Sequence, residues 1–415
     1  MEMKRVVVTG LGTINPIGNS VPEYWANLEK GVSGSELITS FDASKFKTKF
    51  ACQVKNFDPN AYFDRKELKK IDPYTQFALV AVEEAMKDSG LNPEAIDLDM
   101  AGVVWASGIG GMQTFTEELR GYFAGDGTPR FSPYFIPRMI SDIAAGHISI
   151  KYGFRGPNFS TVSACASSTN GIISALDIIR TGKASVIIAG GSEASVNEVG
   201  VGGFNSMQAI SVNNDEYKTA SRPFDATRDG FVIGEGGGCL ILEEYEHAKA
   251  RGAKIYCELK GGGMSADAYH LTAPHPEGLG ARKVMENALK DAGLTIKDID
   301  YINVHGTATP LGDIAEAKAI ISVFGDYAFK LNISSTKSMT GHLLGAAGAI
   351  EAIAAIFAIC TDTIPPTINF KSPDPEIDSR LNITPNSAQK RSVKAALSNT
   401  FGFGGHNASI IFQKI

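Results

Sequence analysis

The residue best suited to covalent chemistry in this sequence is Cys165. It lies in the run of small side chains Ser163-Ala164-Cys165-Ala166-Ser167-Ser168, between a β-prone stretch and an apolar segment of helical period. This pattern predicts a strand-to-helix turn that carries the thiol at a helix N-terminus, where backbone N–H groups and the helix dipole stabilise a thiolate. Because a free cysteine is more often a small buried apolar residue, its neighbours in the fold have to decide between the two interpretations.

Two histidines and a lysine lie where they could act beside this thiol. His305 directly follows a β-branched run at residues 302–304, and open α/β sheets place ligands at the carboxyl ends of their strands. Lys337 and His342 bound a short polar segment that runs into a strongly apolar helix. A neutral imidazole donates a hydrogen bond from one ring nitrogen and accepts one at the other, which suits charge stabilisation in a catalytic site.

A glycine-rich turn near the carboxyl end is the third chemical feature. The run Phe401-Gly402-Phe403-Gly404-Gly405 lies between two strand-like stretches. Glycines allow a backbone to approach a ligand closely and to direct N–H groups at it.

The elements that would position these residues repeat along the chain. Residues 80–91 and 284–294 both read as helix ends, closing on Lys-Asp-Ser-Gly-Leu and Lys-Asp-Ala-Gly-Leu, and each leads through an acidic loop into a β-branched strand. The helices after Cys165 and after His342 occupy equivalent places in their halves. An approximate twofold axis between two α/β halves would therefore bring the thiol opposite the imidazole.

Strands that alternate with helices predict parallel sheets covered on both faces. We expect a first half at residues 1–255, carrying the cysteine and several insertions, and a second half at residues 256–415, carrying the histidines. Because no Pro- or Ser-rich linker separates them, we expect one compact unit.

Composition limits the classes of function. The net charge of −6 over 415 residues argues against a nucleic-acid partner. Five scattered cysteines without a Cys-x-x-Cys pair predict neither disulfides nor a zinc site and suit a reducing cytoplasm. The start of the chain does not read as a signal peptide. The apolar stretch 343–360 is interrupted by Glu351 and rich in Ala and Gly, so we expect an interior helix rather than a membrane span.

These motifs in this order resemble the β-ketoacyl-acyl carrier protein synthases of type II, the thiolase-superfamily condensing enzymes of bacterial fatty acid synthesis. The resemblance implies a thiolase-like α/β fold of two duplicated halves, layered α-β-α-β-α. It also implies an acyltransferase that condenses an acyl group held on Cys165 with malonyl-acyl carrier protein, releasing CO2 and β-ketoacyl-acyl carrier protein.

The resemblance also implies roles for individual residues. The catalytic group would be Cys165, His305, His342 and Lys337. The oxyanion site and gate would involve Cys165, Phe403 and Phe401, with the backbone N–H groups of Cys165 and Phe403 as donors. The network that pairs with Lys337 would comprise Asp313, Glu316 and Glu351. Glu351 fits this independently, because a carboxylate inside an apolar helix needs a partner.

The substrate contacts follow from the same resemblance. Thr307 and Thr309 would bind the pantetheine amides. The acyl pocket would be lined by Ile109, Phe135, Phe204 and Phe231. The carrier protein would dock on Arg65, Lys66, Lys69, Lys70 and Arg130. We expect no metal and no cofactor of its own, since the carrier brings the phosphopantetheine arm, although the family allows a structural monovalent cation. We also expect a homodimer, with no nucleic-acid or membrane partner.

Other classes stay open at this stage. A ketosynthase of a polyketide or aryl-polyene pathway would share these motifs. A non-catalytic chain-length partner subunit shares the fold but lacks the nucleophile, so Cys165 argues against it. A nicotinamide-dependent dehydrogenase would explain Gly10-Leu11-Gly12 after a strand, but the third glycine of that motif is missing.

Overall fold

The strands and helices described here come from a computed structural model that describes residues 3–415. The strands of the main sheet are β1 (Val6–Ile14), β4 (Ala101–Ala106), β5 (Asn158–Thr161), β6 (Val186–Glu193), β7 (Gly236–Glu244), β8 (Cys257–Ala266), β9 (Tyr301–Asn303), β10 (Asn332–Ser334), β13 (Ala395–Gly402) and β14 (His406–Gln413). Two short ribbons pair β2 (Glu36–Leu37) with β3 (Phe50–Ala51) and β11 (Thr363–Ile364) with β12 (Gln389–Lys390).

The helices are α1 (Val21–Lys30), α2 (Arg65–Leu68), α3 (Pro73–Ser89), α4 (Met112–Ala124), α5 (Phe135–Met139), α6 (Ile143–Tyr152), α7 (Ser167–Arg180), α8 (Glu198–Ser206), α9 (Tyr245–Ala250), α10 (Leu279–Ala292), α11 (Pro310–Phe324), α12 (Lys337–Thr340) and α13 (Ala347–Thr361). Capping residues set several of their ends. In α3, the Asp72 side chain accepts a hydrogen bond from the Tyr74 N–H at the start, and Gly90 ends the helix in the left-handed conformation.

The main sheet consists of two five-stranded halves with the same strand order. One half runs β1-β7-β6-β4-β5 and the other β8-β14-β13-β9-β10, and they join where β1 pairs briefly with β8. In each half the second strand from the junction, β7 or β14, is antiparallel to both of its neighbours, and the outer three strands are parallel to one another. The duplication predicted from the repeat is therefore confirmed, whereas the boundary at residue 255 stays a prediction.

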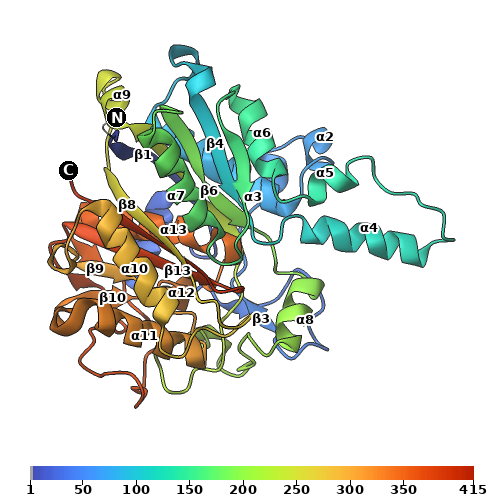
Figure 1. Cartoon of the computed structure of the whole chain (residues 1–415). Helices are drawn as coiled ribbons and strands as arrows, with labels where there is room; N and C mark the ends of the chain where they lie inside the picture. Colours follow the sequence, from blue (N-terminus) through green and yellow to red (C-terminus); the bar gives the residue numbers. More distant parts are fainter. Residues whose placement is uncertain (1–2) are drawn as a thin grey trace.

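Helices cover both faces of each half and also fill the space between the halves. Helices α7 and α13 lie in the centre and contact strands of both halves, while α3 and α6 pack on one outside face and α10 and α11 on the other (Figure 1). This is the predicted α-β-α-β-α layering. Because β4 and β6 are covered on both faces, every residue in them is buried, which explains why their sequences are apolar except for Ser192 and Glu193 at the end of β6.

Helix α13 is the most apolar helix of the fold. By length and composition the stretch Leu344–Thr361 could cross a membrane, but 83% of it is buried inside the protein. It packs against α7 and the central strands, as the sequence analysis expected for an interior helix.

The glycines of β1 serve packing rather than nucleotide binding. A β-carbon at Gly12 would lie 1.9 Å from the carbonyl oxygen of Ala81, and one at Gly10 would lie 2.4 Å from that of Ala85. Only glycine lets this strand lie so close to α3. The motif that suggested a dehydrogenase is thus explained by contact between a strand and a helix.

Candidate active site

Cys165 lies in a tight turn between β5 and α7. Ala164, just before it, has a φ of +50°, a left-handed conformation that is rare for a residue with a side chain. The Ser167 hydroxyl closes the turn, because it accepts from the Ser163 N–H at 2.8 Å and donates to the Ala164 carbonyl at 2.6 Å. These bonds hold the sulfur just before the first turn of α7, as the sequence predicted.

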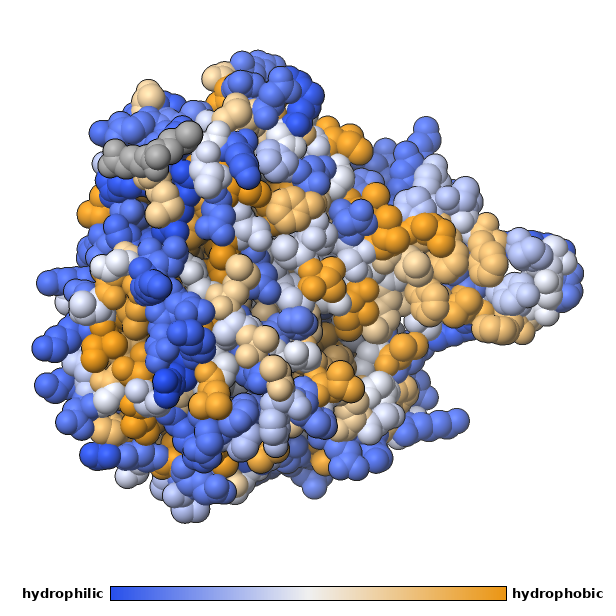
Figure 2. Space-filling model, viewed as in Figure 1, coloured by the Kyte–Doolittle hydropathy of each residue, from blue (hydrophilic) through white to orange (hydrophobic). Residues whose placement is uncertain are grey.

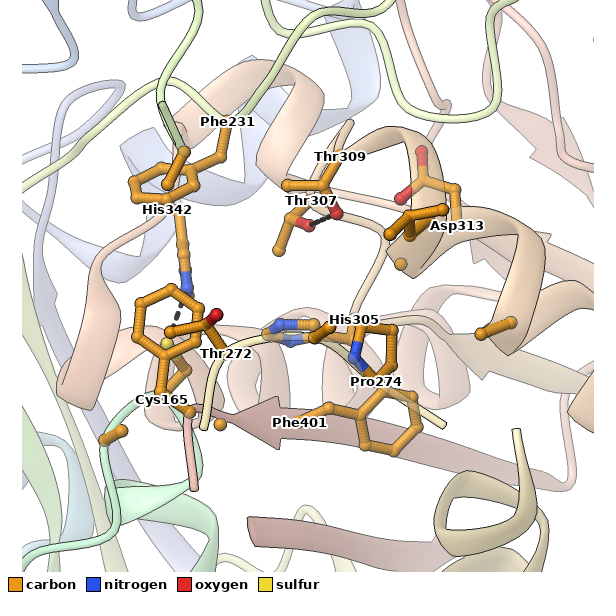
Figure 3. Close-up of a pocket in the computed structure, with 18 of the residues that line it drawn as sticks. Cys165, Phe231, Thr272, Pro274, His305, Thr307, Thr309, Asp313, His342 and Phe401 are labelled. Atoms are coloured by element: carbon orange, nitrogen blue, oxygen red, sulfur yellow. Dashed lines mark hydrogen bonds between the residues drawn. The ribbon is translucent and has the colours of Figure 1, made fainter. Parts of the chain in front are cut away.

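His342 reaches this sulfur from the other half of the chain. Its backbone is fixed by two bonds, from its own N–H to the Val232 carbonyl at 2.7 Å and from the Gly234 N–H to its carbonyl at 2.9 Å. The Nε2 atom then lies 3.0 Å from the Cys165 Sγ atom (Figure 3). The ring of Phe231 packs edge-on against the imidazole, with centroids 5.2 Å apart.

His305 completes the group from the end of β9. Its N–H and that of Gly306 donate to the two carboxylate oxygens of Glu316 at 2.9 and 2.8 Å, which fixes the loop after the strand. The His305 and His342 rings stand nearly perpendicular, with centroids 5.3 Å apart. The thiol and both imidazoles therefore meet, as predicted.

Burial sets the protonation of this group. It lowers the pKa of both His305 and His342 well below the ordinary value, and the positive charge of Lys337 acts in the same direction. Burial also raises the pKa of the Cys165 thiol to about 12, although Lys337 and the Phe403 backbone N–H act in the opposite direction. Burial therefore favours the uncharged form of the thiol and of both imidazoles.

Lys337 is buried and bonds to one of its three predicted partners. Its ammonium donates to Glu351 on α13, and both side chains are at most 2% exposed. Glu316 instead accepts from the His305 loop and from the Asn399 side chain at 3.3 Å. Asp313 pairs with the Arg228 guanidinium at 3.3 Å rather than with Lys337, so its predicted partner was wrong.

A cavity of about 680 Å³ opens onto the thiol and the imidazoles. Most of the predicted contact residues line it, namely Ile109, Phe204, Phe231, Thr307, Thr309, Phe401 and Phe403. The Thr307 and Thr309 hydroxyls lie 3.0 Å apart on one wall (Figure 3). Phe135 is an exception: it lies outside this cavity at the start of α5, stacked with Phe131 at 5.4 Å between ring centroids and near Phe115 on the projecting α4.

The glycine-rich turn packs directly on Cys165. A β-carbon at Gly402 would lie 2.7 Å from the Ser163 carbonyl oxygen and 3.1 Å from the Cys165 nitrogen. This contact brings the Phe403 N–H to the sulfur. The Phe401 ring lies 5.5 Å from the His305 ring, between centroids. The backbone N–H groups of Cys165 and Phe403 can thus face the oxygen of an acyl group whose carbonyl carbon is bonded to the sulfur.

The predicted docking residues lie on and near α2. Arg65, Lys66, Lys69 and Lys70 are exposed there, and Lys70 Nζ lies 5.9 Å from the ring centre of Tyr134, next to α5. Arg130 lies on the loop after α4 and pairs with Asp126 at 3.2 Å. Their role stays a prediction.

Sequence reasoning missed two buried charged residues behind the site. Glu193, at the end of β6, accepts hydrogen bonds from the N–H groups of Gly108 at 2.7 Å and Gly345 at 3.0 Å, and burial raises its pKa to about 7. Arg228 contacts the loop that carries Thr307 and Thr309. An acid that closes a buried strand could have been noticed, but nothing in the sequence around Arg228 indicates its partners.

The family models match the chain in two parts. The beta-ketoacyl synthase N-terminal domain matches residues 3–248, and the C-terminal domain matches residues 256–371. A 3-oxoacyl-[acyl-carrier-protein] synthase 2 from Staphylococcus aureus (strain COL) is 48% identical over 413 residues, which is 100% of this chain and 99% of that protein. The protein of the same name from Coxiella burnetii (strain RSA 493 / Nine Mile phase I) is 46% identical over 415 residues and 100% of both chains.

Solved structures agree with these matches. A beta-ketoacyl synthase from Burkholderia phymatum STM815 superposes with a TM-score of 0.92 at 35% identity, covering 100% of both chains. A type II PKS ketosynthase, solved with its acyl-carrier protein and a hexaketide, gives a TM-score of 0.92 at 36% identity over 100% of both chains.

Proposed function

The chain belongs to the beta-ketoacyl synthase family, and we propose that it condenses an acyl group held on Cys165 with malonyl-acyl carrier protein. The products are CO2 and a β-ketoacyl-acyl carrier protein two carbons longer. One observation carries this proposal: a thiol and two neutral imidazoles meet at the end of one cavity. Thioester exchange needs the thiol, and stabilisation of an enolate needs the two imidazoles.

In the first step, Cys165 attacks the thioester carbonyl of the acyl-carrier protein. The sulfur–carbon bond to Cys165 forms while the bond to the pantetheine sulfur breaks, and the thiol proton passes to that leaving sulfur. His342 Nε2, 3.0 Å from Sγ, is the nearest group able to relay this proton. The N–H groups of Cys165 and Phe403 would hold the oxyanion.

In the second step, the malonyl group loses CO2 and leaves an enolate. Its oxygen accepts hydrogen bonds from His305 and His342, which donate as neutral imidazoles because burial lowers the pKa of both. The carbanion then attacks the acyl carbonyl on Cys165. A carbon–carbon bond forms, the sulfur–carbon bond breaks, and the Cys165 thiolate takes up a proton.

Fatty acid elongation fits better than a specialised pathway. The relatives named 3-oxoacyl-[acyl-carrier-protein] synthase 2 are 46–48% identical to this chain over almost their whole length, whereas the type II PKS ketosynthase is 36% identical. The presence of Cys165, His305 and His342 argues against a non-catalytic chain-length subunit.

The proposed partner is an acyl carrier protein, which presents its substrate on a phosphopantetheine arm. The exposed cations of α2 offer a basic surface for an acidic carrier. The hydroxyls of Thr307 and Thr309, which line the cavity, offer hydrogen bonds to the amides of the arm. We place this encounter in the cytoplasm, a reducing compartment that suits five free cysteines.

A second copy of this chain is the proposed partner for one apolar face. Strand β5 is an edge of the main sheet, and Phe159 and Val162 near it are 38% and 60% exposed. Apolar side chains also gather on the projecting α4 region, where Phe123 is 76% exposed (Figure 2). An unpaired edge beside an apolar patch favours pairing with an identical edge.

A structural monovalent cation would fit the polar cluster around Lys337. The oxygens Asn303 Oδ1, Glu351 Oε2 and Ser398 Oγ are buried and have no hydrogen-bond partner within residues 3–415. Ser398 and Asn303 pair across β13 and β9, and oxygen atoms are the ligands that such ions prefer. A bound cation would satisfy these oxygens and hold the loops that carry the catalytic group.

The direct test is condensation with defined substrates. Purified protein is mixed with hexanoyl-carrier protein and malonyl-carrier protein, and the products are identified by mass spectrometry. We expect a 3-oxo product two carbons longer, together with CO2. Cys165→Ala should abolish it, whereas Cys360→Ala, at a cysteine far from the cavity, should not. Wild-type protein that forms no carbon–carbon bond would refute the proposal.

A further inference from the structure

Arg228 is a buried cation that contacts neither the thiol nor the imidazoles. Its side chain is 2% exposed. One Nη atom donates to the Asp374 carboxylate at 2.6 Å and to the Asp225 carbonyl at 2.8 Å, and the other donates to the Pro310 carbonyl at 2.7 Å. The Nε atom donates to the Thr309 carbonyl at 3.3 Å. The guanidinium thus donates hydrogen bonds to two successive backbone carbonyls of one loop, those of Thr309 and Pro310.

That loop carries the two threonines of the cavity wall. Ala308, between them, has a φ of +66°, a conformation that a residue with a side chain adopts only when its surroundings impose it. Its N–H donates to Asp313 at 3.2 Å, and its carbonyl accepts from the Gly230 N–H at 3.1 Å. Arg228 pairs with the same Asp313, so the guanidinium and its neighbour Gly230 together impose the turn.

The planar guanidinium is what this position needs. Its N–H groups point in fixed directions and serve three carbonyls and two carboxylates at once, whereas a lysine ammonium is a single point charge on a flexible stem. A lysine here would keep the charge opposite Asp313 and Asp374 but could not hold both carbonyls. The Thr307 and Thr309 hydroxyls would then lose their fixed orientation.

We propose that Arg228 is a positioning residue for substrate recognition: it holds the loop 307–310 so that both threonine hydroxyls face the amide-bearing arm of the substrate. This inference rests on the proposed function, since it assumes that the cavity receives a pantetheine thioester. The residue touches no substrate itself. Its effect is therefore on binding of the arm and not on the chemistry at Cys165.

The test compares two thioesters that carry the same acyl group. Hexanoyl-pantetheine has both amides, and S-ethyl hexanethioate has neither. The rate at which each acylates the protein is followed by mass spectrometry over a range of concentrations. For Arg228→Lys we expect the KM for hexanoyl-pantetheine to rise by about tenfold, equivalent to loss of one good hydrogen bond, with little change in the maximal rate. The kinetics with S-ethyl hexanethioate should match those of the wild type.

Arg222→Lys is the matched control. Arg222 lies in the same segment and its side chain is 5% exposed, but it bonds to Glu216, Thr219 and Thr227 and not to the loop 307–310. Its KM for both thioesters should stay at the wild-type value. Should Arg228→Lys fail to fold, Asp374→Asn weakens one anchor of the guanidinium by removing its negative charge at a partly exposed position, and a smaller rise in the same KM is expected.

The outcomes separate the two proposals. If wild-type protein is not acylated by hexanoyl-pantetheine, the proposed function fails. If the wild type is acylated but Arg228→Lys and Asp374→Asn leave the KM unchanged, the inference about Arg228 is overturned. An equal loss with both thioesters overturns it as well, because that pattern indicates a general structural role.

Discussion

The Nε2 atom of His342 lies 3.0 Å from the Sγ atom of Cys165, although 177 positions separate the two residues in the chain. Each residue lies just before a central helix, Cys165 before α7 and His342 before α13, and these helices hold equivalent places in the duplicated halves. The contact therefore follows from the internal symmetry of the fold. It joins a thiol from one half to an imidazole from the other.

The pH profile of decarboxylation should show that the imidazoles act as neutral groups. Burial lowers the pKa of His305 and His342 below 6.5, so raising the pH from about 6 to about 8 removes no proton from either ring. The rate of CO2 release from malonyl-carrier protein should not fall over this range. A rate that declines in step with loss of imidazolium ions near pH 6.5 would contradict the assignment.

Removal of Lys337 should destabilise the protein in a pH-dependent manner. Lys337→Met leaves Glu351 buried without its partner, at a cost of about 3–5 kcal/mol when the carboxylate is charged. Burial raises the pKa of Glu351 to about 7. The loss of stability in Lys337→Met should therefore be small at acidic pH, where the carboxyl group is protonated, and should grow as the pH rises toward 7 and above and the carboxylate becomes charged. Urea unfolding at about pH 5 and pH 8 measures this difference in the free energy of unfolding.

Two further variants check the origin of that loss. Lys337→Met combined with Glu351→Leu should recover much of the stability at pH 8, since no buried charge remains. Lys87→Met, which breaks the exposed pair with Glu83, should change little. A double variant as unstable as Lys337→Met would show that the ion pair is not the cause.

Phe403→Ala should separate folding from turnover. The variant keeps the backbone N–H that faces the sulfur but loses the side chain between flanking glycines, so the fold should be intact. We expect condensation to slow by about tenfold, a barrier change of about 1.4 kcal/mol, because the ring no longer orders the two half-reactions. Quenched assays of acylation and of condensation measure both rates, with Tyr245→Ala on α9, outside the cavity, as control. Unchanged rates in both half-reactions would rule out a gate.

Charge reversal on α2 should weaken carrier-protein binding. Lys66→Glu combined with Lys69→Glu should raise the KM for hexanoyl-carrier protein several-fold at low salt, and the difference should shrink as salt screens the charges. Kinetics with hexanoyl-pantetheine should be unaffected. Lys290→Glu, on α10 at the opposite side of the chain, serves as the control (Figure 1). An equal effect from Lys290→Glu would mean that net charge matters rather than this surface.

The sequence predicted the parts of the site that follow from repetition and local pattern. Cys165 and His342 could be paired because each precedes an apolar helix at an equivalent place, and the duplicated layers followed from the alternation of strands and helices. Arg228 could not be assigned, since its carboxylate partner Asp374 lies 146 positions away and its other partners are mostly backbone carbonyls. For the same reason Asp313 was paired with the wrong cation.

The place of Phe135 in the family pattern was not sufficient to predict where its side chain lies. Its local sequence does not say which way the ring at the start of α5 points, and in the fold the ring stacks with Phe131 and lies near Phe115 instead of lining the cavity. The glycine-rich turn lies close to Cys165 and contributes to the burial of its sulfur, and this closeness is a property of the folded chain that no local pattern indicates.

The most direct test of the account is the site of acylation. Protein is incubated with hexanoyl-carrier protein, and samples are taken before and after addition of malonyl-carrier protein. Each sample is digested, and the mass of every cysteine-containing peptide is measured by mass spectrometry. We predict one hexanoyl group on the peptide that contains Cys165, and its loss when malonyl-carrier protein is added. A stable acyl group on Cys52, Cys239, Cys257 or Cys360, or an acylated Cys165→Ala variant, would contradict the central claim.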